Sequence, residues 1–117
     1  MAETIYCNLT PHALKVRTLD GSTITIAPDE RGAARVIYDR FPPEHVRIDG
    51  HEISVSVAGA PREIIGLPDA EPGVVLIVAK AVSDAAPAYR GDLMSPGKLI
   101  RNEDGTVIGC DGLTRRA

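Results

Sequence analysis

The run Val74-Val75-Leu76-Ile77-Val78-Ala79 is the longest uninterrupted apolar segment of this chain of 117 residues. It has none of the polar alternation of a strand with one face in water, and such runs are typical of strands that are covered on both faces. We therefore predict that this segment forms a central strand of the fold, with other strands on either side of it.

The segment that follows, residues 80–86, is the only stretch of the chain that favours a helix. Pro87 ends it, because proline lacks the amide proton that helical hydrogen bonding needs. A helix of about two turns is not stable in isolation. We therefore predict one short helix that packs on the sheet.

Upstream of this unit, apolar and polar residues alternate with the period of two that is typical of half-buried strands. The pairs Asp20-Gly21 and Asp49-Gly50 are strong signals for hairpin turns, and residues 45–58 around the second pair form the clearest hairpin of the chain. The other predicted strands cover residues 4–9, 14–17, 23–27, 33–38 and 62–66.

Downstream, residues 89–96 are predicted to be irregular, whereas 98–101 and 106–110 form a closing hairpin. Helices do not alternate with strands, which disfavours a doubly wound α/β fold. We predict a mainly β fold (a β-rich α+β protein): a small antiparallel barrel or sandwich of about eight short strands, with one short helix near residues 80–86. The length fits a single domain, 1–117.

Aromatic residues are rare, with three Tyr, one Phe and no Trp. The core must therefore consist of Val, Ile, Leu and Ala. Little is left for stacking bases, which disfavours the binding of open single-stranded nucleic acid. The formal net charge of −3 also argues against general nucleic-acid binding, which needs a clustered basic surface.

The longest apolar run is far shorter than the ~20 residues that a membrane-spanning helix needs. Residues 1–4 lack the basic and apolar regions of a signal peptide. We therefore expect no association with a membrane and a location in the cytoplasm. The two cysteines, Cys7 and Cys110, are expected to be reduced, buried thiols rather than a disulfide.

The spacing of the residues matches no common catalytic or metal site. Residues 91–98 (GDLMSPGK) resemble a phosphate-binding loop, but the segment is one residue too long and Leu99 stands where a Ser or Thr must bind magnesium. Three His and two Cys are scattered without the spacing of a metal site. We therefore expect no metal, no cofactor and no catalytic residues, and favour a protein that is not an enzyme.

Two places stand out as candidates for ligand contact. His12 lies in a turn between two predicted strands, where its imidazole either bonds to backbone carbonyls or contacts a ligand. Arg90 and Asp92 flank a glycine after the helix, where they either form a salt bridge that holds the loop or leave Arg90 to bind an anion. Both alternatives stay open at each place.

The segments NLTPH at 8–12 and GAARV at 32–36 resemble a family of small proteins encoded by bacteriophages and prophages, whose members begin with an NLTPH motif. The resemblance continues through VLIVAKAV at 75–82, through RGD at 90–92 and through the last hairpin. It therefore spans nearly the whole chain.

This resemblance implies a phage-encoded accessory protein that acts by binding in the cytoplasm of a bacterial host. Small phage proteins often act against host defence, by sequestering a nucleotide immune signal or by blocking a defence protein. A nucleotide would need cationic and backbone donors around its phosphates and a ring against its base. The residues expected to bind such a ligand are His12, Arg35, Lys80, Tyr89, Arg90 and Asp92. With so few aromatic residues, we expect the pocket to be completed in a homo-oligomer.

Two alternative functions stay open beside this one. The first is a minor virion or assembly protein whose β-rich body contacts other phage proteins. The second is a small nucleotide-processing hydrolase, in which His12 would act with a carboxylate. Detection of the chain in purified virions would favour the first, whereas degradation of a candidate nucleotide on incubation with the protein would favour the second.

Overall fold

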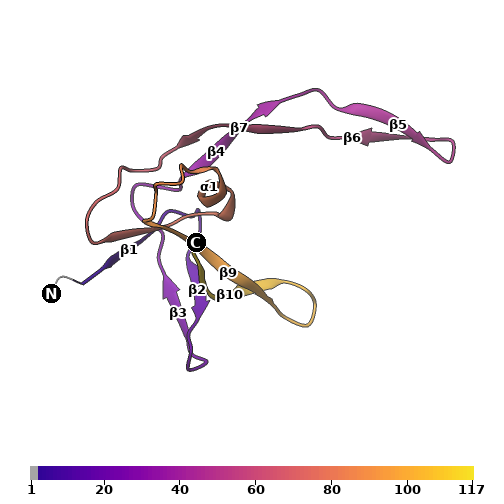
Figure 1. Cartoon of the computed structure of the whole chain (residues 1–117). Coiled ribbons are helices and arrows are strands. Elements are labelled where there is room, and N and C mark those ends of the chain that lie inside the picture. The colour runs from indigo at the N-terminus through magenta and orange to yellow at the C-terminus, as the bar shows by residue number, and fades with distance from the viewer. Residues whose placement is uncertain (1–2) are drawn as a thin grey trace.

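This computed structural model describes residues 3–117, which contain ten strands and one short helix (Figure 1). Strands hold 50% of the residues and the helix 5%, so the predicted mainly β class is confirmed. Residues 1–2, on which part of the argument against a signal peptide rested, lie outside the described residues. The elements are β1 (Ile5–Asn8), β2 (Leu14–Arg17), β3 (Thr23–Ile26), β4 (Arg35–Arg40), β5 (Glu44–Ile48), β6 (His51–Val55), β7 (Ala58–Ile65), β8 (Val74–Ile77), α1 (Lys80–Ala85), β9 (Leu93–Arg101) and β10 (Val107–Thr114).

The body of the protein is a small, nearly closed barrel. Six strands form one sheet in the order β1-β8-β9-β10-β2-β3. A parallel bridge between Asn8 and Pro28 brings the segment after β3 back to the end of β1, and the amide of Asp29 donates to the Asn8 carbonyl at 2.8 Å. The two edges of the sheet thereby approach each other, and the predicted small barrel with one short helix is confirmed.

The apolar run at residues 74–79 takes the expected inner position in this sheet. β8 pairs with β1 on one side, where Cys7 lies opposite Leu76, and with β9 on the other, where Leu76 lies opposite Leu93. Leu76, Ile77 and Val78 are at most 2% exposed. The lack of polar alternation therefore has the predicted cause, because the strand is covered on both faces.

Strand direction differs from the expected antiparallel arrangement. The pairs β1–β8, β8–β9 and β10–β2 run parallel, whereas β9–β10 and β2–β3 are antiparallel. Side chains alternate with the same period in both kinds of pair, so the hydrophobic pattern does not encode direction. The chain passes from β8 to β9 through α1, and such a crossover connection lets two consecutive strands run parallel.

The main core lies between the sheet and α1 and is aliphatic, as the composition predicts. Val36 from β4 and Ile64 from β7 pack against it. α1 lacks a side-chain cap at Ala79 and is held instead by the burial of Val82. The buried members of the core are Leu9, Ala34, Leu76, Val78, Val82, Ala86 and Leu93.

Among the described residues, no helix is long and apolar enough to cross a membrane.

The C-terminal tail returns to the end of this helix. The guanidinium of Arg116 donates to the carbonyls of Ala86 and Pro87, both at 2.9 Å. The last carbonyls of a helix lack partners within the helix, and a basic side chain can satisfy them. The tail therefore helps to end α1.

The prediction that residues 89–96 are irregular is wrong for 93–96, which open β9. Pro96 was the signal against a strand, because it cannot donate to a ladder. The Met94 carbonyl accepts from the Val78 amide at 2.8 Å, so the nitrogen of Pro96, two residues later, lies on the same side. β8 has already ended at Ile77, and the missing donor is not needed there.

The predicted hairpin at 45–58 is present, but it lies outside the barrel. β5 and β6 pair over Glu44–Ile48 and His51–Val55, and Asp49 (φ 50°) and Gly50 (φ 80°) form the turn with positive φ at both positions. β4 and β7 carry this hairpin away from the barrel (Figure 1). The molecule is therefore elongated, with extents of 65 × 37 × 28 Å.

Candidate functional site

The distinctive NLTPH segment is organised around the side chain of Asn8, which is 1% exposed. Its Nδ2 donates to the carbonyls of His12 (3.0 Å) and Ile26 (2.9 Å). Its Oδ1 accepts from the amide (2.9 Å) and the hydroxyl (2.6 Å) of Thr10. Only an amide side chain supplies both donors and an acceptor in this way. The motif therefore joins β1, the turn after it and the end of β3.

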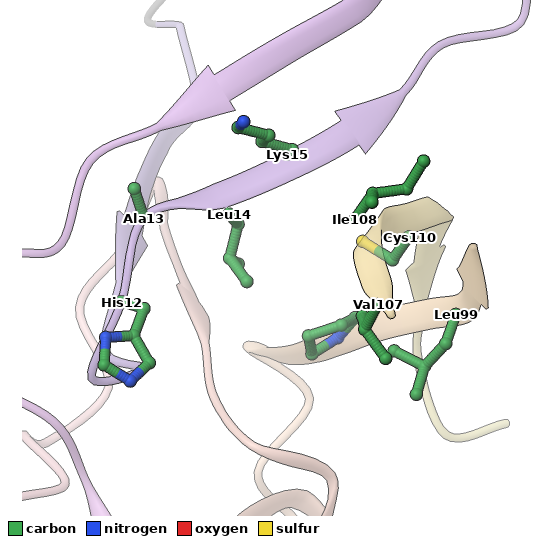
Figure 2. A pocket seen from close by; sticks show the side chains of 10 residues that line it. His12, Ala13, Leu14, Lys15, Leu99, Val107, Ile108 and Cys110 are labelled. Atoms are coloured by element: carbon green, nitrogen blue, oxygen red, sulfur yellow. The ribbon is translucent and has the colours of Figure 1, made fainter. Parts of the chain in front are cut away.

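His12 contributes its backbone carbonyl, rather than its ring, to this network. The carbonyl accepts from Asn8, and the Thr10 hydroxyl, whose shorter contact is to Asn8, lies 3.0 Å from it. The residue is exposed, and its imidazole stands at the edge of a hollow on the barrel (Figure 2). The turn thus holds the ring at the surface, where it can be reached from solution.

Arg90 and Asp92 form a bidentate salt bridge that holds the loop before β9. Nε and Nη2 of Arg90 each lie 2.9 Å from a carboxylate oxygen of Asp92, and Nη2 also donates to the Pro68 carbonyl at 2.9 Å. The two side chains are only 11% and 13% exposed. The hydrogen bond from Arg90 lowers the pKa of Asp92, although desolvation opposes the shift. An anion would have to compete with this carboxylate for Arg90.

The remaining predicted ligand residues are exposed and separate. Lys80 pairs with Asp84 across one turn of α1 at 2.8 Å, Tyr89 is 84% exposed, and Arg35 is exposed at the start of β4. His12 and Arg90 line different hollows. The structure therefore does not bring the six residues into one site of a single chain, and nucleotide binding by them stays a prediction.

A hollow of about 500 Å³ opens between β2 and the hairpin of β9 and β10 (Figure 2). Its walls are mostly aliphatic, and Leu99, Val107 and Ile108 are 44–51% exposed. The floor includes the buried thiol of Cys110. We call it the barrel hollow. The ten residues that line it include Leu14, Leu99, Val107, Ile108 and Cys110, together with the basic residues His12 and Lys15.

The chemistry of the barrel hollow suits an apolar group with acidic neighbours. No carboxylate is among the residues that line it, and Lys15 is the one residue with a permanent positive charge among them. Figure 2 shows the Lys15 side chain on the side of β2 opposite to Leu14. Within residues 3–117, no three His, Cys, Asp or Glu side chains gather as metal ligands would.

The second prominent surface is the arm, which we define as residues 35–65. Its outer part, the tip hairpin, consists of β5 and β6, and every one of these ten residues is exposed. The register sets Val46 opposite Ile53 and Ile48 opposite His51. Residues opposite each other point to the same face of an antiparallel pair, so the tip hairpin has one apolar face and one polar face.

The apolar face of the tip hairpin is uncovered. Its aliphatic residues are Val46, Ile48, Ile53 and Val55, which are 38–53% exposed. Glu44, opposite Val55, and His51, opposite Ile48, lie on the same face at its two ends. His45 lies opposite Ser54, and Arg47 opposite Glu52, on the polar face. An alternating hairpin with one aliphatic face is the pattern of a strand pair that packs on another layer, but no layer formed by residues 3–117 covers it.

The tip hairpin carries a net negative charge. Residues 44–55 contain three carboxylates, Glu44, Asp49 and Glu52, against the single guanidinium of Arg47. Its sign is therefore opposite to that of the basic residue beside the barrel hollow.

His12 is the one predicted ligand residue that lines the barrel hollow, and none of the six lies on the tip hairpin. Alternation predicted the strands of the tip hairpin, and it also defines their apolar faces. The residues of the barrel hollow come from β2 and from both strands of the last hairpin, so only the fold brings them together. The signal that could have identified the tip hairpin is an amphipathic hairpin bounded by Pro42-Pro43 and Gly59, which separate it from its neighbours.

Comparison with known proteins gives no family to which the chain can be assigned. No family model, curated protein or solved structure matches it. Inference about function therefore rests on the geometry of the arm and of the barrel hollow.

Proposed function

We propose that this protein is a non-catalytic assembly module, in which the barrel is the body and the arm is the element that binds a second copy of the chain. The observation that carries the proposal is the uncovered apolar face of the tip hairpin. A two-stranded hairpin is at best marginally stable in water by itself. Packing against another surface would stabilise the hairpin and remove its aliphatic side chains from water.

The overall dimensions support this proposal. The radius of gyration is 17.8 Å, whereas a compact domain of this length has roughly 13 Å. The chain exposes 8701 Å², against about 6,100 Å² for a compact monomer of this mass. The excess of about 2,600 Å² is larger than the ~800 Å² that each partner buries in a standard interface. Self-association therefore has ample surface available.

Among the functions that the family resemblance implies, this proposal corresponds to the minor virion or assembly protein. Contact between proteins through an extended arm needs neither a nucleotide pocket nor a catalytic pair. If the protein is a component of virions, mass spectrometry of purified phage particles will detect it in a fixed ratio to the other structural proteins. A protein present only in the infected cell would contradict a place in the virion, but not the self-association.

The test of self-association is the molar mass of the purified protein, measured by light scattering after size exclusion at ~1–100 µM. We expect a multiple of the 12.4 kDa chain mass. Ile53→Asp places a carboxylate on the apolar face and should reduce the mass to that of one chain, because a buried unpaired charge is strongly unfavourable. Ser54→Asp makes the same charge change on the polar face of the same strand and should leave the mass unchanged.

The outcomes separate clearly. A wild-type protein that is monomeric at ~100 µM would refute the proposed function. Equal effects of the two substitutions would show that charge, and not the apolar face, controls association. Circular dichroism and thermal melting of both variants provide the check on folding, since residues 53 and 54 are exposed and neither belongs to the core.

A further inference from the structure

We infer that the barrel hollow is the receptor for the tip hairpin of a second copy, so that copies of the chain associate head to tail. This inference rests on the proposed function and specifies which two surfaces meet. Both are exposed, both are largely aliphatic, and they lie on different parts of the chain.

Both surfaces consist mainly of aliphatic side chains, and the volume of the barrel hollow corresponds to a few such side chains. The tip hairpin presents Val46, Ile48 and Ile53 from one face. The barrel hollow presents aliphatic walls around about 500 Å³, within the ~300–1,000 Å³ that is typical of hollows that enclose a small organic group. A few aliphatic side chains are of that size. The burial of both surfaces would be favourable in water.

The charges of the two surfaces are complementary. Lys15 and His12 stand beside the barrel hollow, and no carboxylate lines it. The tip hairpin carries Asp49 at its turn and Glu44, opposite Val55, on its apolar face, within a segment of net negative charge. Opposite potentials on facing surfaces guide association and fix orientation. Two tip hairpins packed face to face would instead bring two acidic segments together.

The geometry of one chain requires that the contact be between molecules. The arm leaves the barrel beside α1, where Val36 and Ile64 pack into the core, and extends outward from it (Figure 1). The residues that line the barrel hollow come mainly from β2 and the β9–β10 hairpin. These strands lie below α1 in Figure 1, whereas the arm extends above it. A contact between two different surfaces is heterologous, and it gives a closed ring or an open filament when repeated.

A mixing experiment tests this arrangement with full-length protein. Ile53→Asp removes the arm contact and leaves the hollow intact. Ile108→Asp places a carboxylate in the hollow and leaves the arm intact; Ile108 is 50% exposed and lies outside the core. We expect each variant alone to associate at least ~30-fold more weakly than wild type, the usual effect of changing an interface hot spot.

The two variants mixed in equal amounts should form a pair with twice the mass of one chain. In that pair, the intact arm of the Ile108→Asp chain enters the intact hollow of the Ile53→Asp chain. Light scattering gives the mass, and a fluorescent label on one variant gives its affinity for the other. The matched control for the hollow is Leu19→Asp, the same kind of change at a fully exposed side chain outside the hollow, and it should associate like wild type.

Each result has one meaning. If Ile108→Asp associates like wild type, the hollow is not the receptor and the inference is overturned, while the proposed function stands if Ile53→Asp is monomeric. If both variants are monomeric and their mixture is too, the head-to-tail contact is overturned. If wild type itself is monomeric, the proposed function fails as well.

Discussion

Replacing Asn8 by alanine should destabilise the barrel far more than the same replacement of an exposed asparagine. The Asn8 amide is 1% exposed and makes four hydrogen bonds, which join β1 to the following turn and to the end of β3. The parallel bridge from Asn8 to Pro28 nearly closes the barrel at the same place. Asn8→Ala therefore tests whether the NLTPH segment is a structural motif in this chain.

The loss in free energy of unfolding depends on which hydrogen-bonding partners of the Asn8 side chain are left without any hydrogen bond. The carbonyl of His12 can still accept from the hydroxyl of Thr10, which lies 3.0 Å away, and Ile26 remains paired with Leu14 in the β2–β3 ladder. The amide of Thr10 loses the bond that Asn8 made with it. A buried polar group without a partner costs ~1–3 kcal/mol, and each further lost hydrogen bond costs about 1 kcal/mol, so we expect Asn8→Ala to lower the free energy of unfolding by about 3 kcal/mol. For a domain of this size, the melting temperature should fall by about 10 °C or more.

Chemical denaturation followed by circular dichroism measures this loss. The matched control is Asn102→Ala, because the Asn102 Oδ1 also accepts two backbone amides, from Asp104 (3.2 Å) and Thr106 (3.0 Å), but in an exposed turn. Water can replace those bonds, so the control should cost less than ~1 kcal/mol. If Asn8→Ala costs no more than Asn102→Ala, the structural role of the motif is refuted.

Three further predictions address the barrel, its loop and the arm. Gly97→Ala should lower the free energy of unfolding by at least ~2 kcal/mol in denaturant titration, because the new Cβ would collide with the carbonyl oxygen of Asp111; an unchanged midpoint would contradict this close approach. The hydrogen bond from Arg90 lowers the pKa of Asp92, so the ion pair contributes to the free energy of unfolding above pH ~4, and this contribution is lost as the pH falls through the lowered pKa. Asp92→Asn should therefore lower the free energy of unfolding by about 1.5–3 kcal/mol at pH 7 and by less at pH 2–3. A loss that does not change with pH would argue against the ion pair. Replacing residues 43–56 by Asn-Gly should leave the melting temperature within a few degrees of wild type, since the core has no member there, while abolishing association in light scattering; an unfolded product would show that the barrel needs the tip hairpin.

Features that depend on neighbours in the chain could be predicted from the sequence. The Asp49-Gly50 pair specifies a turn because both residues must adopt positive φ, which these residue types tolerate. The unbroken apolar run of β8 requires cover on both faces, and the proline after α1 limits the helix. The salt bridge of Arg90 and Asp92 was one of two alternatives, and it is present because two residues two positions apart can meet without help from the rest of the fold.

The sequence by itself thus determined that the protein is mainly β, where most strands and turns lie, and that its core is aliphatic, since these follow from periodicity, turn chemistry and composition. Only the tertiary structure decided the strand directions, the nearly closed barrel and the residues that line its hollow, because these depend on contacts between distant segments. It also decided the position of the tip hairpin. Alternation shows that one face of a hairpin is apolar, but what covers that face depends on the path of β4 and β7, which carry it away from the core.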